Sequence, residues 1–217
     1  MSVLVPLGRG FSRLLDLLAP TSCAGCDRPN LPNSAFCAEC LEELEPPPER
    51  SVDGRPVLAL ASYGGPVATA VKRLKFGGRS DLAGSLGGML AEVLVSGGQP
   101  LVPVPLHRKR LRERGYNQAA LLARAAARRA GVAHHPRLLD RVRCTARQAQ
   151  LDHEQRQHNV ARAFVVRRGG APLGRKQPAE VVLVDDVVTT GATVAACIDA
   201  LGAAGVSVSA VLALAIR

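Results

Sequence analysis

Two carboxylates and a run of threonines follow one apolar segment of the chain. The uncharged stretch Val181-Val182-Leu183-Val184 leads into Asp185 and Asp186, and then into Val187-Val188-Thr189-Thr190-Gly191-Ala192-Thr193. Its mostly β-branched residues predict a strand buried on both faces of a parallel sheet, and open α/β proteins bind ligands at the carboxyl ends of such strands. Small residues, backbone N–H groups and hydroxyls at a helix start form a cradle for phosphate. This stretch is therefore predicted to bind a phosphate-bearing ligand.

A simpler interpretation of these residues stays open. The two carboxylates would then only end a strand in a solvated turn, and Thr193 would only cap the next helix. Adjacent residues of a strand point to opposite faces. Asp185 and Asp186 are therefore expected to reach one ligand only if the chain already turns there.

A second group of residues with chemical potential lies near the N-terminus. Two C-x-x-C pairs, Cys23 with Cys26 and Cys37 with Cys40, are separated by ten residues. Each C-x-x-C turn directs two sulfurs to one side, so the two pairs predict a tetrahedral, structural Zn²⁺ site. The segment is too small for a core of its own, and metal binding would supply its folding energy. Disulfides and a redox C-x-x-C pair are the alternatives, and a chain without an export signal disfavours disulfides.

A third group is strongly basic. The segment from residue 107 to 114 follows a short apolar strand that ends in proline, and it carries five positive charges in eight residues. It is predicted to be a second anion site, and the alternative is a basic surface loop. The candidate anion-binding residues are His107, Arg108, Lys109, Arg110, Arg112 and Arg114.

Alternating strands and helices must position these groups. Strands are predicted over 57–63, 101–106, 181–184 and 206–216, and helices over 67–76, from about 80 to 95, from 117 to about 130, and over 194–201. Pro66 suits the first turn of one helix, and Asn117 is expected to cap another. Lys72, Arg73 and Lys75 are expected to be exposed. The polar residues 143–163, with His153 and His158, are expected to form a flap over the site, and 169–178 a loop.

Length and proline placement indicate two modules. The 217 residues suffice for one α/β domain and a small extra unit. Three consecutive prolines, Pro46 to Pro48, cannot continue a helix and stiffen an extended linker. We therefore predict a module over 1–48, with a short N-terminal helix and the zinc ribbon, and a larger domain over 55–217.

The distribution of charge indicates the kind of ligand. The net charge is +10, and residues 101–168 hold sixteen Lys and Arg against four Asp and Glu. Such a concentration favours a polyanion, either nucleic acid or a substrate with several phosphates, although a solvated basic surface is the alternative. No apolar run is long enough to span a membrane and no secretory signal is visible, so a cytoplasmic protein is expected.

The pattern at 181–193 resembles the phosphoribosyl-pyrophosphate (PRPP) loop of type I phosphoribosyltransferases. Further stretches, Pro103-x-Pro105-Leu106 and Arg112-Glu113-Arg114-Gly115-Tyr116-Asn117-Gln118, together with Tyr63 and Lys75-Phe76, resemble the ComF/GntX family. That resemblance covers essentially the whole chain. It implies an α/β fold with a type I phosphoribosyltransferase-like parallel sheet flanked by helices and a small N-terminal zinc ribbon. It also implies a link to DNA uptake in competent bacteria.

The resemblance assigns roles to the residues of the loop. Asp185 and Asp186 would hold the ribose hydroxyls of PRPP, which binds with Mg²⁺, and Thr189 to Thr193 would hold its 5′-phosphate. The basic segment is then the best candidate for the diphosphate. No Ser-His-Asp set is readable, and neither a catalytic base nor an acceptor can be identified from the sequence.

Three functions follow from these observations. The first is a phosphoribosyltransferase with an unidentified acceptor. The second is a non-catalytic protein that binds PRPP or a related nucleotide, and single-stranded DNA, in DNA uptake or processing. The third is a nucleic-acid-binding module with a vestigial phosphate site, which the intact acidic pair and threonine loop disfavour. Base stacking is expected to contribute little to DNA binding, because residues 101–168 have only Tyr116 and Phe164 as aromatic residues.

Overall fold

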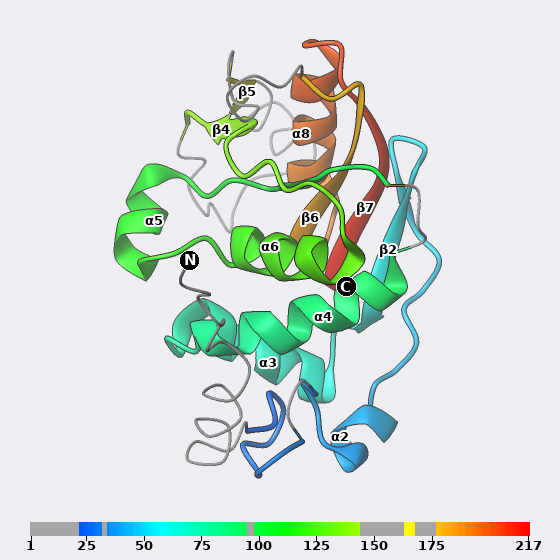
Figure 1. Ribbon diagram of the computed structural model, residues 1–217, viewed down its shortest axis with the longest axis vertical. Coiled ribbons are helices and arrows are strands. Elements are labelled where there is room, and N and C mark those ends of the chain that lie inside the picture. Colours follow the sequence, from blue (N-terminus) through cyan, green and yellow to red (C-terminus); the bar gives the residue numbers. More distant parts are fainter. Residues whose placement is uncertain (1–21, 32–33, 95–97, 144–162, 168–176) are drawn as a thin grey trace, which may run out of the picture.

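A mostly parallel sheet forms the centre of the molecule (Figure 1). The computed structural model describes residues 22–31, 34–94, 98–143, 163–167 and 177–217. In these residues the strand order is β1-β2-β7-β6-β3, with β2, β7, β6 and β3 parallel and β1 antiparallel to β2. The strands are β1 (Ser51–Val52), β2 (Arg55–Ser62), β3 (Leu101–Pro103), β6 (Glu180–Val188) and β7 (Ser207–Ile216). The predicted α/β fold is confirmed.

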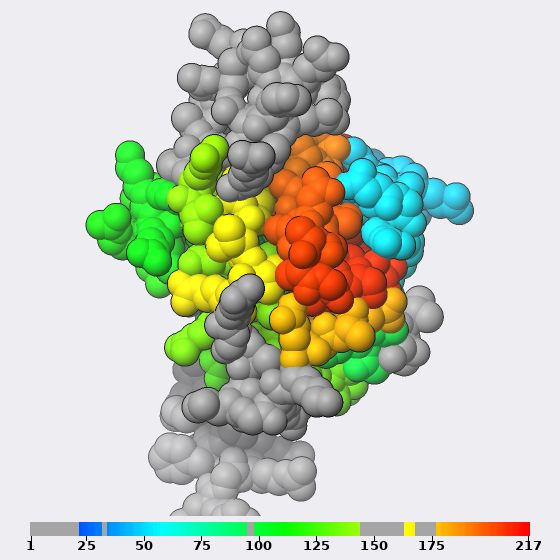
Figure 2. All heavy atoms as spheres, turned by 90° about the horizontal axis from the view of Figure 1, so that it is seen from above, coloured from blue at the N-terminus to red at the C-terminus, as the bar shows by residue number. Residues whose placement is uncertain are grey.

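Helices cover both faces of this sheet. One face packs against α3 (Gly65–Phe76), α4 (Ala83–Val93) and α6 (Gln118–Ala130) in one apolar cluster. The other face packs against α8 (Ala192–Gly202) and a small antiparallel sheet of β4 (Leu139–Arg141) and β5 (Phe164–Val166). Figure 2, which looks onto the end where β6 and β7 begin, shows α8 and the turn after it (orange) between the β1–β2 hairpin (cyan) and β5 (yellow).

The core is aliphatic and depends on close approach between helices. A Cβ on Gly87 of α4 would lie 2.5 Å from Ala125 Cβ and 2.7 Å from the Leu122 carbonyl oxygen of α6. Any larger side chain at Gly87 would therefore push the two helices apart. Small residues at this crossing let α4 and α6 form one layer over the sheet, which helps to explain how a chain with few aromatic residues builds a core.

The position of strand β6 inside the sheet explains why its residues are apolar on both faces. Val182 and Val184 belong to the cluster under α3, α4 and α6, whereas Val181 and Leu183 belong to the cluster under α8. A strand in the middle of a covered parallel sheet buries every side chain, as the uninterrupted apolar run predicted.

Several predicted boundaries need correction. The strand predicted over 101–106 ends at Pro103, and the helix predicted from about residue 80 begins with a 3₁₀ turn (Ser80–Leu82) without a side-chain cap. The Asp81 carboxylate instead accepts from Arg79, with Nη2 and Oδ2 2.8 Å apart. The basic segment is not a loop, which was the alternative prediction for it. It forms a helix, α5 (Arg108–Arg114). Asn117 caps α6 as predicted, since its Oδ1 accepts from the Ala119 N–H at 3.0 Å.

Some expectations fall outside the described residues. They are the short helix before residue 22, most of the flap predicted over 143–163 with its two histidines, and most of the loop predicted over 169–178. Among the helices that the structure describes, none combines the length and the apolar character that a membrane crossing requires.

Candidate functional site

One pocket lies where the parallel strands of the described sheet end. Its volume is about 300 Å³. Tyr63 follows β2, the segment 104–106 follows β3, Asp185 and Asp186 lie near the end of β6, and Arg217 follows β7. Backbone hydrogen bonds join these ends, for example from the Tyr63 N–H to the Ile216 carbonyl oxygen at 2.7 Å. The pocket thus occupies the edge at which open α/β sheets bind ligands.

The acidic pair is still part of a regular strand. β6 continues to Val188, and Asp185 pairs in register with Ala213 of β7. The chain therefore does not turn at the acidic pair, which was the condition expected for both carboxylates to reach one ligand. Both carboxylates line the pocket although the strand runs through them.

Asp186 lies on the same face as α3 and is paired with it. Lys75 Nζ is 2.9 Å from Asp186 Oδ2, and the two side chains are 24% and 4% exposed. The expectation that Arg73 and Lys75 are exposed is wrong, because both side chains are only 24% exposed, whereas Lys72 is exposed as expected. Lys75 brings a positive charge into the pocket, where the sequence by itself suggested a surface residue.

Asp185 lies on the other face, toward α8. Its Oδ1 accepts a hydrogen bond from the Asp186 N–H at 2.8 Å. Burial, followed by the charge of neighbouring Asp186, raises the pKa of Asp185 to about 8. The same surroundings raise the pKa of the Cys197 thiol, through burial and then the Asp185 charge. At neutral pH the Asp185 carboxyl is therefore largely protonated and can donate a hydrogen bond as well as accept one.

The threonine loop forms a tight entry into α8. Gly191 precedes the helix with φ +82°, and a Cβ there would lie 2.8 Å from Val52 Cγ2 of β1. Both the positive φ and the close approach to Val52 require glycine at this position. Thr189 and Thr193 line the pocket, and the Thr190 hydroxyl accepts from the Ala192 N–H at 3.4 Å. The first N–H groups of any helix have no intrahelical partner, and here they start beside the pocket.

The basic segment lies apart from this first pocket. In α5 no residue is buried, and His107 serves as its N-cap by accepting from the Lys109 N–H at 3.2 Å. None of the six predicted anion-binding residues lines the first pocket. Arg110 and Arg114 line a second pocket of about 380 Å³, together with Lys75, which borders both.

Eight lining residues of the first pocket were not among the predicted site residues, and Lys75, Gln118 and Arg141 are three of them with polar side chains. Lys75 comes from the end of α3, and buried Gln118 from the start of α6. Arg114 Nη1 donates to Gln118 Oε1 at 2.5 Å and so links α5 to the pocket wall. Arg141 comes from β4, and its guanidinium carbon lies 5.3 Å from the centre of the Phe164 ring. Lys75 and Gln118 were both part of the family resemblance, but no pattern in the sequence marked Arg141.

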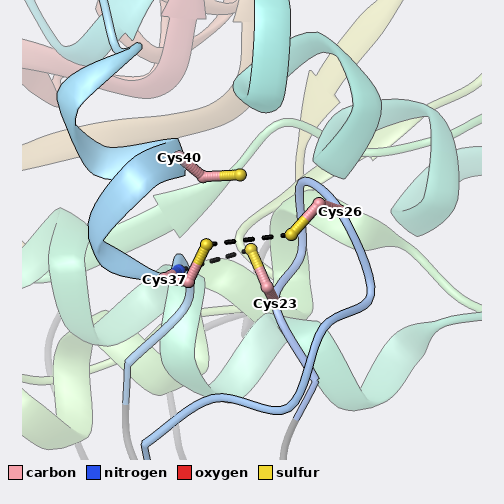
Figure 3. A group of neighbouring side chains, drawn as sticks. All are labelled: Cys23, Cys26, Cys37 and Cys40. Carbon is pink, nitrogen blue, oxygen red and sulfur yellow. Dashed lines mark hydrogen bonds between the residues drawn. The ribbon is translucent and has the colours of Figure 1, made fainter.

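The four cysteines of the N-terminal module meet as predicted (Figure 3). Their sulfurs lie within 4.8 Å of one another, and Cys26 Sγ and Cys37 Sγ are 3.7 Å apart. Zn–S bonds of ~2.3 Å in a tetrahedron place the sulfurs about 3.8 Å apart, so this group fits a zinc ion. Cys37 precedes the short helix α2 (Ala38–Glu42), which carries Cys40.

Local electrostatics favour the thiolate form of Cys26, which a metal ligand requires. Hydrogen bonds from the backbone and then the side chain of Arg28 lower the pKa of Cys26 to about 6. Burial raises the pKa of the Cys40 thiol. A Cβ on Gly25 would lie 2.9 Å from Cys40 Sγ, so glycine is required in the first knuckle for the sulfurs to approach. The donor set and its tight backbone fit a structural metal site.

The cysteine module packs directly on α3. Cys23 and Cys40 belong to the same apolar cluster as α3, α4 and α6. Arg73 of α3 donates to the Ala24 carbonyl oxygen at 3.0 Å and pairs with Asp27 at 2.7 Å. The predicted boundary between a module over 1–48 and a domain over 55–217 stays a prediction, but the two parts share one core.

Comparison with known proteins finds relatives that match most of the chain, although no family model matches it. The DNA utilization protein YhgH of Salmonella typhi is 38% identical over 181 residues, which cover 80% of this chain and 74% of that protein. YhgH of Escherichia coli K12 is 35% identical over 199 residues, 87% of this chain and 82% of that protein. Competence protein F of Haemophilus influenzae is 28% identical over 190 residues, 79% and 80% of the two chains.

Proposed function

This chain belongs to the ComF family, together with competence protein F and the DNA utilization protein YhgH, and we propose that it binds PRPP and transfers the phosphoribosyl group to an acceptor. The observation that carries the proposal is the composition of the first pocket. It combines two carboxylates, a threonine loop at a helix start, and a half-buried lysine at the carboxyl ends of parallel strands.

Each part of PRPP has chemically suitable residues in the pocket. The 5′-phosphate would bind at the start of α8, where Thr189 and Thr193 supply hydroxyls and the helix supplies backbone N–H groups. The ribose hydroxyls would bind Asp185 and Asp186, one of which is neutral in the free protein and can donate a hydrogen bond.

The diphosphate would lie toward Lys75, at the border of the two pockets. Arg110 and Arg114 are the members of the basic segment that approach this border, and Mg²⁺ would accompany the diphosphate. The bond between C1 and the diphosphate oxygen breaks, a bond from C1 to the acceptor forms, and diphosphate leaves with the electron pair. Electrostatic stabilisation of this leaving group and positioning of the sugar would supply most of the catalysis.

The names of the relatives support a role in competence or DNA utilization. We therefore place the proposed activity in the handling of DNA or its nucleotides. Binding without turnover is the second candidate function. It is favoured by one observation, that no histidine lines either pocket in the described part of the chain, so no obvious base activates an acceptor.

Calorimetry can test the binding site directly. PRPP with Mg²⁺ should bind the wild type, and the double variant Asp185→Asn, Asp186→Asn should lose this binding while it keeps the fold. Asp199→Asn removes an exposed carboxylate from α8 and serves as the control. Unchanged affinity in the double variant would refute the assignment. Release of diphosphate in the presence of candidate nucleobases then separates transfer from binding alone.

A further inference from the structure

The second pocket combines positive charge with aromatic surface. Its volume is about 380 Å³, and it lies between the end of α3 and helix α5. The lining residues are Lys75, Phe76, Gly78, Arg110, Glu113, Arg114 and Tyr116. Three cations against one carboxylate make this pocket attractive to an anion.

Phe76 is unusual in its exposure. It is 69% exposed, and it is the only aromatic residue among the large apolar side chains exposed in the described ranges. The Arg114 guanidinium carbon lies 5.3 Å from the centre of its ring. Water contact of a phenylalanine is unfavourable for the isolated protein, so its place in a lined pocket points to a ligand that covers it.

The walls around Phe76 are held in place. The Tyr116 hydroxyl donates to the Leu74 carbonyl oxygen at 2.6 Å, and burial raises the pKa of this hydroxyl. Arg114 is fixed by its hydrogen bond to Gln118. The pocket wall is therefore preformed around Phe76, with the Arg114 guanidinium held beside the aromatic ring.

We propose that this pocket binds a nucleobase of single-stranded DNA, stacked on Phe76, with the neighbouring phosphates held by α5. Stacking on an exposed ring beside a basic groove is the general way in which proteins hold single strands without sequence preference. A single strand fits better than a free nucleotide, because α5 continues the positive charge beyond the pocket with Arg108, Lys109 and Arg112.

This site overlaps the one proposed for PRPP only at the diphosphate end, where Arg110 and Arg114 are also candidates, and it assigns stacking to Phe76 of α3, which lies outside the basic segment. Lys75 borders both pockets, so the two ligands meet there. PRPP, which carries a diphosphate, should weaken DNA binding, whereas ribose 5-phosphate, which lacks one, should not. The DNA-binding proposal itself does not depend on PRPP binding.

Fluorescence anisotropy with a labelled oligothymidylate tests the proposal on the full-length protein. Phe76→Leu should weaken binding at least about fivefold, the lower end of the effect of one stacked base. Phe76→Tyr should restore it. Arg110→Gln and the matched control Arg108→Gln remove the same charge from the same helix, but only Arg110 lines the pocket. Arg110→Gln should therefore weaken binding more.

Four results would overturn the proposal. They are wild-type affinity in Phe76→Leu, equal losses in the two arginine variants, binding of duplex DNA as tight as that of the single strand, and binding of free thymidine monophosphate as tight as that of the oligonucleotide. Melting temperatures of all variants show whether they fold, and Phe76 is exposed enough that its replacement should leave the fold intact. The variant Asp185→Asn, Asp186→Asn should lose PRPP and keep DNA, so that failure of one proposal is distinguished from failure of the other.

Discussion

Replacing Asp185 with Asn should make the protein more stable while it damages the proposed ribose site. The carboxyl is partly buried next to Asp186, and its pKa is raised from 3.8 to about 8. Asn keeps the size of the side chain and an oxygen that can accept from the Asp186 N–H, now 2.8 Å away. The substitution therefore removes an unfavourable charge and preserves the local hydrogen bond.

The pH dependence of this effect has a definite sign. Between about pH 4 and pH 8 the folded protein holds a proton on Asp185 that the unfolded chain has released, so the stability of the wild type falls as pH rises. The advantage of Asp185→Asn should grow over this window and level off above it. A pKa raised by about four units corresponds to an upper limit of roughly 5–6 kcal/mol.

Contact with water and relaxation of the pocket should reduce the realised gain. A gain of about 2 kcal/mol would raise the melting temperature by roughly 4–8 °C in a chain of this length. Scanning calorimetry at about pH 5 and about pH 9 measures this gain in melting temperature for Asp185→Asn, with the wild type and the exposed control Asp199→Asn beside it. A variant that melts at or below the wild-type temperature at the higher pH would refute the reasoning, as would a gain that shrinks as pH rises.

Three further predictions follow from the structure. Elemental analysis should find one zinc per chain, and joint replacement of Cys23, Cys26, Cys37 and Cys40 by Ser should remove it and lower stability; full stability of the metal-free variant would contradict a structural role. Gly191→Ala should lower the free energy of unfolding by at least about 1 kcal/mol, because of the positive φ and the contact with Val52. Gly84→Ala, in α4 with open space around it, should instead raise it by roughly 0.5–1 kcal/mol, and chemical denaturation compares the two variants. Lys75→Met should cost about 3 kcal/mol by leaving Asp186 buried and unpaired, and Asp186→Asn in the same chain should recover part of this loss in a double-mutant cycle.

Local patterns were sufficient for much of the framework. The apolar run at 181–184 predicted a buried strand, Asn117 predicted the start of α6, and the cysteine spacing predicted the four-sulfur group. Each of these depends on residues close in sequence, whose backbone geometry is nearly independent of the rest of the fold. Helix caps, strand burial and C-x-x-C turns are such local features.

The secondary structure of α5 could not be predicted in the same way. Its five positive charges indicated an anion site, with a basic surface loop as the alternative, and like charges repel in a helix as they do in a loop. What places Arg110 and Arg114 beside Lys75 is the packing of the chain after β3 against α6 and the end of α3. The hydrogen bond from Asn117 Nδ2 to the Val104 carbonyl oxygen, at 3.0 Å, is part of that arrangement.

The sequence by itself determined the α/β framework, the cysteine group and the acidic pair with its threonine loop, because short-range geometry and side-chain chemistry are sufficient for each. Only the tertiary structure decided which residues from distant segments meet them. Lys75 pairs with Asp186, 111 positions later in the chain, because the last turn of α3 lies beside this part of β6, and Phe76 next to it faces α5. The raised pKa of Asp185 has the same origin, since burial and a fixed neighbouring charge exist only once the sheet and its covering helices have formed.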